Sequence, residues 1–434
     1  MLKDITAILV DYAEQSILNK ALFSLIPIRN KLHSIIVITE EKISTNFMME
    51  SEWFDKIEFI SNEINDSGQL LNNTIDEIST EYVLLLQDTD YLSPKISSET
   101  LELDQSKTAL VTSYEISNKV IHRPYLLLTS FIKKEKFMSD FQLPFKESRL
   151  PAMLLKVEIS CQQFKEGVVK QARKNSSTNS IEKAKIIEKY QLNPVKTNYT
   201  SLSVIVSNYN MEKYVETAVV SCLLQNEHFD QILIIDDGST DNSYNNLKQW
   251  NKFNHVKIFH KKNEGKAIAL NQLLSEVTSD FILELDADDW LDPDAVSTVK
   301  ELLHDLPKEF SLLYGNLKKW KQLDRDVVFK GESKGIQIDG ISNLLSYHFP
   351  LGPRIYRTSS LKEVGGFPVI PFENGRLYED VSVLTRLINI SKFHYQNFTI
   401  YNVREHKESI TRNSDAKWNE YLKILKFNIN ENSD

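Results

Sequence analysis

Short apolar runs alternate with segments of helical spacing along the first half of the chain. Three runs, rich in β-branched residues or leucine, are Ile5–Val10, Ser34–Ile38 and Tyr82–Leu86. Runs of this length and composition are typical of strands that are buried on both faces of a parallel sheet. Between them, Ser16–Leu25 and Gln69–Ile78 carry apolar residues at helical spacing. The alternation predicts an α/β domain with a parallel sheet.

The second half of the chain repeats this pattern. Its apolar runs are Leu202–Ser207, Gln231–Ile235, Val256–Phe259 and Phe281–Leu285. They predict a second α/β domain by the same argument.

The two halves also share small polar and aromatic positions in one order. The matching segments are Ile8–Tyr12 with Ile205–Tyr209, Ile36–Ile38 with Leu233–Ile235, Tyr91–Pro94 with Trp290–Pro293, and Arg149-Leu150 with Arg376-Leu377. Any two parallel α/β domains have similar strands, but they need not share polar residues in the same order. We therefore interpret the halves as an internal duplication.

A charged segment separates the halves. Cys161–Tyr190 has helical spacing, interrupted by the polar stretch Asn175–Ser180, which we interpret as a loop that provides a serine cap for the next helix. Its lysines are more typical of a solvated helix face than of an anion-binding surface. We expect a domain at 1–160, a helical linker at 161–200 and a second domain at 201–434.

Length and composition agree with two globular domains. The chain has 434 residues, 41% of them hydrophobic, and its net charge of −9 argues against non-specific nucleic-acid binding. Two cysteines, Cys161 and Cys222, are too few for a disulfide framework or a zinc site and favour a reducing cytoplasm. The sequence shows neither a signal-peptide pattern nor an apolar run of the roughly 18 residues that a membrane span needs. We expect a soluble cytoplasmic protein, at most peripheral to a membrane.

Two acidic clusters follow buried strands of the second half. Asp236-Asp237, followed by Gly-Ser-Thr-Asp, lies where open α/β sheets bind ligands, and its carboxylates suit ribose hydroxyls or a base N–H. The same residues are typical of a plain turn, so this segment alone leaves both interpretations open. The second cluster is Asp286-Ala-Asp288-Asp289. Such closely spaced acids repel one another unless a cation neutralises them, and their hard oxygens suit Mg²⁺ or Mn²⁺ that holds a diphosphate.

Three weaker signals accompany these clusters. Gly265-Lys266 at a helix start would let the backbone and a lysine approach a phosphate, although this pair is common at helix starts. Glu379-Asp380 also opens a helix, where acids usually compensate the helix dipole. His406 follows a strand-like run, and alone it would be taken as a structural residue.

In order and spacing these segments resemble the family-2 inverting glycosyltransferases of the GT-A fold. The resemblance runs through most of Ser201–Arg412 and includes the opening strand Ser203–Asn210, Asp-Asp-Gly-Ser-Thr-Asp, Asn-x-Gly, Asp-x-Asp-Asp, Gly-Gly-Phe, Glu-Asp and Arg-x-His. With the duplication, it implies an α/β fold of two GT-A-like, Rossmann-like domains of the nucleotide-diphospho-sugar transferase type, in tandem and joined by a helical linker.

The resemblance also implies roles for individual residues. Asp380 would be the catalytic base with Glu379 beside it, and Asp288 and His406 would bind the metal, Mn²⁺ or Mg²⁺. The donor, a nucleotide-diphosphate sugar with UDP favoured, would contact Ser207, Tyr209, Asn210, Asp236, Asp237, Asn263, Gly265, Lys266, Asp286 and Ala287.

The implied reaction is one in-line displacement with inversion, in which Asp380 takes the proton of an acceptor hydroxyl. A saccharide, a lipid-linked sugar or a protein fits as acceptor, in bacterial surface polysaccharide or glycoconjugate synthesis. The alternatives are a non-catalytic nucleotide-sugar-binding or scaffold protein, a nucleotidyltransferase and a processive synthase. A nucleotidyltransferase would need a glycine-rich basic loop at the place of Ser207–Asn210. A processive synthase would need a Gln-x-x-Arg-Trp segment, whereas Gln322–Arg325 is followed by Asp326.

The first half departs from the family pattern at the functional positions. Thr39 and Glu40 stand at the positions that match Asp236 and Asp237, and Gln87 and Thr89 at those that match Asp286 and Asp288. Ala152 and Met153 stand at the positions that match Glu379 and Asp380. Since methionine cannot accept a proton, we interpret residues 1–160 as a GT-A-like domain without catalysis that packs on the active half, binds the acceptor or mediates homo-oligomerisation. A one-residue shift would instead restore a metal site at Asp88 and Asp90.

Overall fold

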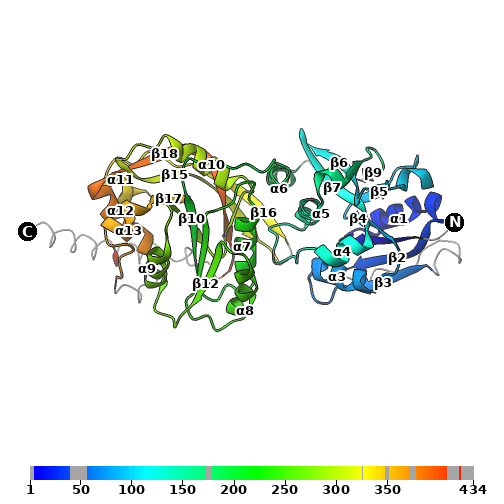
Figure 1. The fold of residues 1–434 in the computed structure, drawn as a ribbon, viewed down its shortest axis with the longest axis horizontal. Helices are drawn as coiled ribbons and strands as arrows, with labels where there is room; N and C mark the ends of the chain where they lie inside the picture. The colour runs from blue at the N-terminus through cyan, green and yellow to red at the C-terminus, as the bar shows by residue number, and fades with distance from the viewer. Residues whose placement is uncertain are drawn as a thin grey trace, which may run out of the picture. The chain divides into compact units, whose positions relative to one another are not determined.

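The chain divides into two compact units, Met1–Leu192 and Asn193–Asp434. The computed structural model describes residues 4–39, 56–172, 177–324, 326–347, 351–370, 378–407 and 420–421. Each unit combines helices with a mixed sheet of its own, so the chain is of the α/β class (Figure 1). Within the described ranges, no helix is long and apolar enough to cross a membrane.

The first unit is built around a seven-stranded sheet of order β3-β2-β1-β4-β7-β6-β8. Its elements are β1 (Ile5–Val10), α1 (Gln15–Ser24), β2 (Leu32–Thr39), β3 (Ile57–Ser61), α3 (Ser67–Glu77), β4 (Tyr82–Gln87), β5 (Asp90–Leu92), β6 (Ala109–Ile116), β7 (Lys119–Leu128), α4 (Thr129–Glu135), α5 (Arg149–Leu154), β8 (Gln162–Phe164), β9 (Val169–Gln171) and α6 (Thr178–Lys189). β1 pairs in parallel with β2 and β4, which confirms the three strands expected from the apolar runs.

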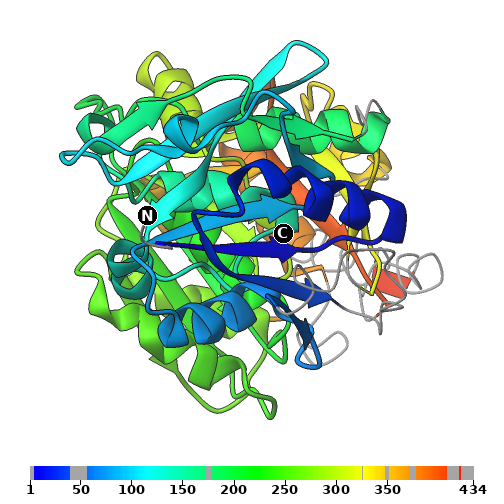
Figure 2. The same cartoon turned by 90° about the vertical axis from the view of Figure 1, so that its right-hand side faces the viewer.

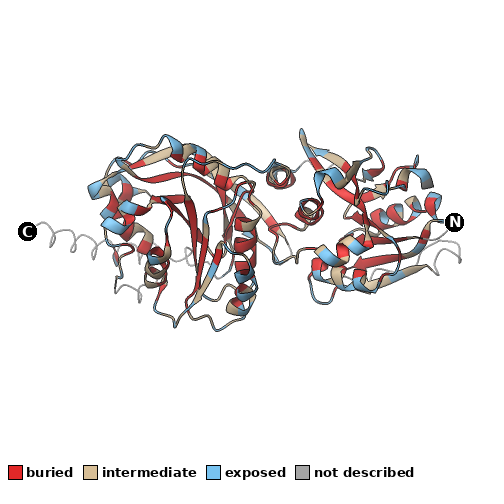
Figure 3. Cartoon of the chain, in the orientation of Figure 1, coloured by how far each residue is buried: buried red, intermediate tan, exposed pale blue. Residues whose placement is uncertain are grey.

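The central strands β1 and β4 of this sheet are almost entirely apolar because both faces are covered. Leu9 of β1 packs in one cluster with Leu18 of α1, and its neighbour Ile8 packs in another with Leu71 of α3. Figure 2 shows α1 and α3 on opposite faces of the sheet. The central strands are accordingly buried along almost their whole length (Figure 3). Burial on two faces explains why continuous apolar runs, and not alternating ones, mark these strands.

The second unit contains a nine-stranded sheet of order β12-β11-β10-β13-β17-β15-β18-β14, with β16 paired to β15. Its elements are β10 (Leu202–Asn208), α7 (Val215–Leu223), β11 (Gln231–Asp236), α8 (Ser243–Lys248), β12 (Val256–His260), α9 (Lys266–Glu276), β13 (Phe281–Asp286), β14 (Trp290–Leu291), α10 (Ala295–His304), β15 (Phe310–Gln322), β16 (Val327–Ser333), α11 (Ile341–Ser346), β17 (Arg354–Arg357), α12 (Thr358–Glu363), α13 (Glu379–Ile390) and β18 (Lys392–Glu405). The four predicted strands of this half are β10 to β13, and β10 is parallel to β11 and β13.

The two sheets share strand order over their first five strands. β3-β2-β1-β4-β7 corresponds to β12-β11-β10-β13-β17, and the last pair is antiparallel in both. The register corresponds as well, because Val10 pairs with Gln87 as Ser207 pairs with Asp286. Gln87 therefore ends its strand at the place where Asp286 ends β13.

The segment 161–200 differs from the helical linker that we expected. Its first part forms β8 and β9, which pair with β6 and β5 of the first unit. Helical spacing could not reveal this pairing, since the strand edges that accept the segment lie far away in sequence. Within the remainder, Thr178–Lys189 forms α6, which packs on β7. The serine cap is confirmed at Ser177, whose hydroxyl accepts from the Ser180 N–H at 3.2 Å. Residues 173–176 lie outside the described residues.

Candidate active site

Three parallel strands of the second unit end in polar residues at one edge of the sheet. β10 ends at Asn208, β11 at Asp236 and β13 at Asp286. Because these strands are parallel neighbours, their carboxyl ends form the ligand-binding edge of an open α/β sheet. The structure thus brings both predicted acidic clusters to the same edge.

Asp236 is fully buried beneath other polar groups. Its carboxylate accepts from Asn208 Nδ2 at 2.7 Å and from the Ser239 N–H at 3.1 Å, and His260 Nδ1 lies 2.9 Å from it. The His260 ring stacks on Tyr244 with 4.0 Å between centroids. The side chain of His260 is 42% exposed. His260 was not among the predicted site residues, although its place at the end of β12 repeats the signal of the other strands.

Asp237 holds the loop that precedes α9. One oxygen accepts from Lys261 Nζ and the Glu264 N–H, both at 3.1 Å, and the other accepts from the Gly265 N–H at 2.9 Å. The residue is 2% exposed. Three protein donors and burial show that Asp237 fixes this loop, and its contact with a donor stays a prediction.

Glycine is required where the two loops meet. Gly238 has a φ of 72°, and a Cβ on it would lie 2.5 Å from the backbone nitrogen of Asn263. Gly265, with a φ of 97°, precedes the first residue of α9. The Asp-Asp-Gly and Asn-x-Gly segments are therefore two halves of one packed loop structure.

The loop after β10 is tied to the same structure. Asn210 has a φ of 54°, and its side-chain oxygen accepts from the Thr240 N–H at 2.8 Å. Tyr209 is 37% exposed, and Ser207 is half-buried opposite Asp286 in the register of β10 and β13. Ala287, which directly precedes Asp288 and Asp289, is buried. Ser207, Tyr209 and Asn210 thus lie at the expected edge, and their contact with a donor stays a prediction.

Lys266 stands among three carboxylates. Its Nζ lies 2.7 Å from Asp286, 2.9 Å from Glu379 and 3.3 Å from Glu284. Burial alone would lower the pKa of Lys266, but the carboxylates of Asp286 and Glu379 outweigh it and hold this pKa well above its usual value. Lys266 is therefore a fixed cation within an acidic network, and its contact with a phosphate stays a prediction.

Glu284 and Arg354 form a buried ion pair that the sequence analysis missed. They are register partners on the antiparallel strands β13 and β17. Arg354 Nε and Nη2 each donate to the Glu284 carboxylate at 2.9 Å, and Tyr356 Oη donates to it at 3.0 Å. The available signal was a glutamate inside the apolar run Phe281–Asp286, where an acid needs a buried partner.

The two acids at the start of α13 differ in exposure. Glu379 is buried and paired with Lys266, whereas the side chain of Asp380 is 24% exposed and lies 3.5 Å from Arg354 Nη1. Burial raises the pKa of Glu379, although Lys266 opposes that effect. For Asp286 the balance is reversed: burial would raise its pKa, but Lys266 and Arg354 lower it to about 2. The preceding Arg376-Leu377 lies outside the described residues.

Asp288 and His406 meet beside this network. His406 Nε2 lies 2.9 Å from Asp288 Oδ2, and its ring lies 4.7 Å from that of Tyr214. Arg404 holds the turn at Asp288 and Asp289 in place. Its backbone N–H donates to the Asp289 carboxylate at 2.7 Å, and its side-chain Nε donates to the Asp288 carbonyl at 2.8 Å. His406 is 4% exposed, whereas the side chain of Asp288 is 21% exposed.

This pair fits a divalent metal that completes its shell with other oxygens. Among the residues that the structure describes, no group of three or more His, Cys, Asp or Glu side chains is arranged as a closed metal cage. Mg²⁺ at nucleotide sites usually takes one or two protein ligands and leaves the remaining positions to phosphate oxygens and water. One carboxylate and one imidazole nitrogen in contact, with the carboxylate partly exposed, agree with that arrangement.

Comparison with known proteins gives a family match within the second unit. Residues 203–364 match the family model described as glycosyl transferase family 2. This segment belongs to that family. It contains Asp236, Asp286 and Asp288, and it ends before α13 and β18.

Relatives of this chain include bacterial glycosyltransferases. The chain is 27% identical over 228 residues to Glycosyltransferase GlyG of Streptococcus pneumoniae, a match that covers 50% of this chain and 75% of GlyG. It is 24% identical over 231 residues to Glycosyltransferase GlyA of the same organism, over 50% of this chain and 32% of GlyA. The crystal structure of S. aureus TarS 1–349 in complex with UDP is similar at a TM-score of 0.35 and 20% identity, over 47% of this chain and 60% of TarS 1–349.

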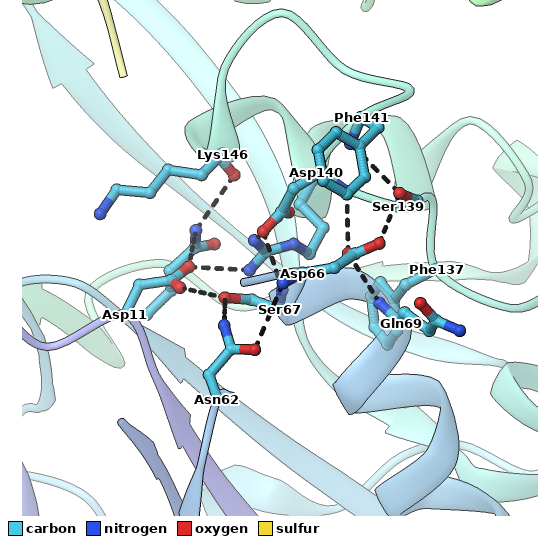
Figure 4. A network of polar contacts seen from close by, with 12 residues as sticks. Asp11, Asn62, Asp66, Ser67, Gln69, Phe137, Ser139, Asp140, Phe141 and Lys146 are labelled. Carbon is cyan, nitrogen blue, oxygen red and sulfur yellow. Dashed lines mark hydrogen bonds and ion pairs between the residues drawn. The ribbon is translucent and has the colours of Figure 1, made fainter. Parts of the chain in front are cut away.

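The carboxyl edge of the first unit differs from that of the second unit. Asp11, just after β1, accepts from Ser67 Oγ and Arg149 Nη1 at 2.8 Å and from Gln87 Nε2 at 3.0 Å. Arg149 also bonds Asp140 at 2.5 Å. Figure 4 shows Asp11, Ser67 and Asp140 facing one another in this network. An arginine paired with carboxylates thus occupies the edge at which the strands of the second unit end in Asp236 and Asp286.

The first residues of α5 and α13 match Arg149 with Glu379, whereas the sequence matched Ala152 with Glu379. α5 begins at Arg149 as α13 begins at Glu379, so an arginine, and not Ala152, stands at the start of the corresponding helix. The alternative metal site at Asp88 and Asp90 is also disfavoured. Asp90 is buried and paired with Arg123, which leaves its carboxylate occupied.

Proposed function

We propose that the second unit transfers a sugar from a nucleotide-diphosphate donor to an acceptor hydroxyl with inversion. A UDP-sugar is the first candidate donor, and a bacterial surface polysaccharide or glycoconjugate is the proposed product. The observation that carries the proposal is one connected network. Lys266 joins the strand-end acid Asp286 to the helix-start acid Glu379, and Asp380 follows directly.

The donor would lie along the carboxyl edge of β10, β11 and β13. Asp236 has no exposed surface, so we assign the outward contact to its partner His260, which is partly exposed and stacked on Tyr244. Ser207, Tyr209 and Asn210 would line the same edge. The fixed charges of Asp286 and Lys266 would orient the ribose and diphosphate beside them.

Asp380 is the proposed base because, of the two helix-start acids, it is the accessible one. Glu379 is buried against Lys266, whereas Asp380 presents part of its carboxylate. In the reaction the acceptor oxygen bonds to the anomeric carbon, the bond from that carbon to the diphosphate oxygen breaks, and the acceptor proton passes to Asp380. Attack opposite the leaving group inverts the configuration.

Asp288 and His406 would hold Mn²⁺ or Mg²⁺. When bound, such an ion neutralises charge on the departing nucleoside diphosphate. The chain positions these two ligands through neighbours: Arg404 bonds the Asp288 carbonyl, and the Tyr214 ring packs on His406. Oriented neighbours of this kind hold metal ligands in place.

A ligand screen tests this proposal. We expect a nucleotide-diphosphate sugar with Mn²⁺ to raise the melting temperature of the full chain, because a ligand that binds only the folded state stabilises it. The ligand that stabilises the chain most is then incubated with saccharide and lipid-linked acceptors, and release of the nucleoside diphosphate is measured. Absence of both stabilisation and release for every donor would contradict the proposal.

For the first unit we propose a non-catalytic role in acceptor binding or self-association. Arg149 and its carboxylate partners fill the edge where a donor would bind. Titration calorimetry should therefore give one donor nucleotide per chain, and Asp288→Asn should weaken that single site. Two equivalent sites per chain, or a site insensitive to Asp288→Asn, would contradict this assignment.

A further inference from the structure

Four carboxylates and two cations form one alternating network in the second unit. Its members are Glu284, Asp286, Glu379, Asp380, Lys266 and Arg354. Lys266 is the cation that contacts Glu379 and Asp286. Arg354 is the cation that reaches Asp380, with 3.5 Å between Nη1 and Oδ2.

The guanidinium of Arg354 is fixed from its other side. Nε and Nη2 form a fork onto the Glu284 carboxylate, and Tyr356 holds that carboxylate with a third hydrogen bond. Glu284 and Arg354 are 1% and 7% exposed, respectively. The planar fork leaves Nη1 pointing away from Glu284, and Nη1 is the atom nearest to Asp380.

Stability alone does not explain a buried pair at this place. Replacing a buried ion pair with apolar residues of similar size is often neutral or stabilising, because each charge loses its hydration. Glu284 interrupts the apolar part of β13, Phe281–Leu285, and its burial keeps it from touching a substrate. A role through its partner accounts for both facts.

We propose that Arg354 is a positioning residue for Asp380 and that Glu284 orients Arg354 for this role. The inference rests on the proposed function, in which Asp380 is the base. Arg354 also lies 3.8 Å from Asp286, so one guanidinium holds the base in register with the acid at the donor edge. Such register matters because a displacement of about 1 Å can slow a reaction about 100-fold.

Arg354→Lys tests the geometry while it keeps the positive charge. A lysine ammonium is a single point and cannot fork onto Glu284 and reach Asp380 together. We expect kcat to fall between about 10- and 100-fold, with the donor KM within about threefold of the wild-type value. Arg357→Lys is the matched control. Arg357 lies on the same strand but bonds the backbone carbonyls of Phe310 and Pro307, so its kcat should not change.

A double variant separates positioning from folding. Glu284→Leu with Arg354→Met removes both charges and leaves neither one buried alone. We expect a folded enzyme whose kcat is as low as that of Arg354→Lys. Wild-type kcat in Arg354→Lys, or in the folded double variant, would overturn the inference.

Asp380→Asn in the same assay distinguishes this inference from the proposed function. Inactive Asp380→Asn together with fully active Arg354→Lys would overturn the positioning role and leave Asp380 as the base. Full activity of Asp380→Asn would overturn the proposed base, and the positioning role with it.

Discussion

Lys266 Nζ and Glu379 Oε1, from the first residues of α9 and α13, lie 2.9 Å apart. A glutamate at the start of α13 is favoured by the helix dipole, whereas a lysine at the start of α9 is not. The carboxylates of Glu379 and Asp286 offset that cost for Lys266. The contact thus joins the helix that follows the Asn-x-Gly loop to the helix that begins with the proposed base.

Removing the charge of Lys266 should damage both activity and stability. Lys266→Met leaves three neighbouring carboxylates without their shared cation, so we expect a loss of about 3 kcal/mol or more in unfolding free energy. We also expect transfer to slow about 100-fold, because a preorganised charge at the site is lost. Urea denaturation and initial rates measure these effects. Lys262→Met, at an exposed lysine of the loop that precedes α9, should behave as wild type.

Metal dependence should be carried by Asp288 and His406. Chelation should abolish transfer and Mn²⁺ should restore it, and His406→Gln should need about 10-fold more Mn²⁺ or higher for half-maximal activity. His304→Gln, at an exposed histidine, serves as control and should leave the Mn²⁺ requirement unchanged. Equal Mn²⁺ requirements in the two histidine variants would remove His406 from the metal site.

Asp88 should destabilise the first unit at neutral pH. Burial raises the pKa of Asp88 to about 6, and although Lys146 opposes this, the folded state binds the proton more tightly than the unfolded state. Stability should therefore fall as the pH rises from about 4 to about 6. Asn tolerates the φ of 60° at this position.

The matching experiment is Asp88→Asn, measured by urea unfolding at two pH values. We expect a gain of about 1 to 2 kcal/mol at pH 7.5, below the full value of the shift because Asp88 is partly exposed, and almost no gain at about pH 4. Asp104→Asn, at an exposed aspartate, should change neither value. A gain that is the same at both pH values would mean that titration is not its cause.

The sequence predicted the parts of the site that follow strands. Asp286 and Asp288 were recognisable because acids directly after an apolar run lie at a known edge of the sheet. The different roles of the two acids within one pair were not recognisable from the sequence. Asp236 and Asp237 look alike in sequence, but Asp237 bonds the loop before α9, and this depends on how two loops pack.

Interactions between distant strands escaped the sequence analysis. Glu284 and Arg354 are partners through the register of β13 and β17, and no local pattern specifies that register. The same limit explains why Gln162–Phe164 was taken as linker, although it pairs with β6. Core strands are predictable from their own composition, whereas edge strands depend on the partner that they meet.

Asp380→Asn tests the central claim most directly, because the change removes the proton acceptor and keeps the size of the side chain. The measurement is the transfer rate, together with binding of the donor nucleotide by calorimetry, on wild type and variant. We predict that transfer falls about 100-fold or more while the dissociation constant for the nucleotide stays within about threefold. Wild-type turnover in Asp380→Asn would contradict the account.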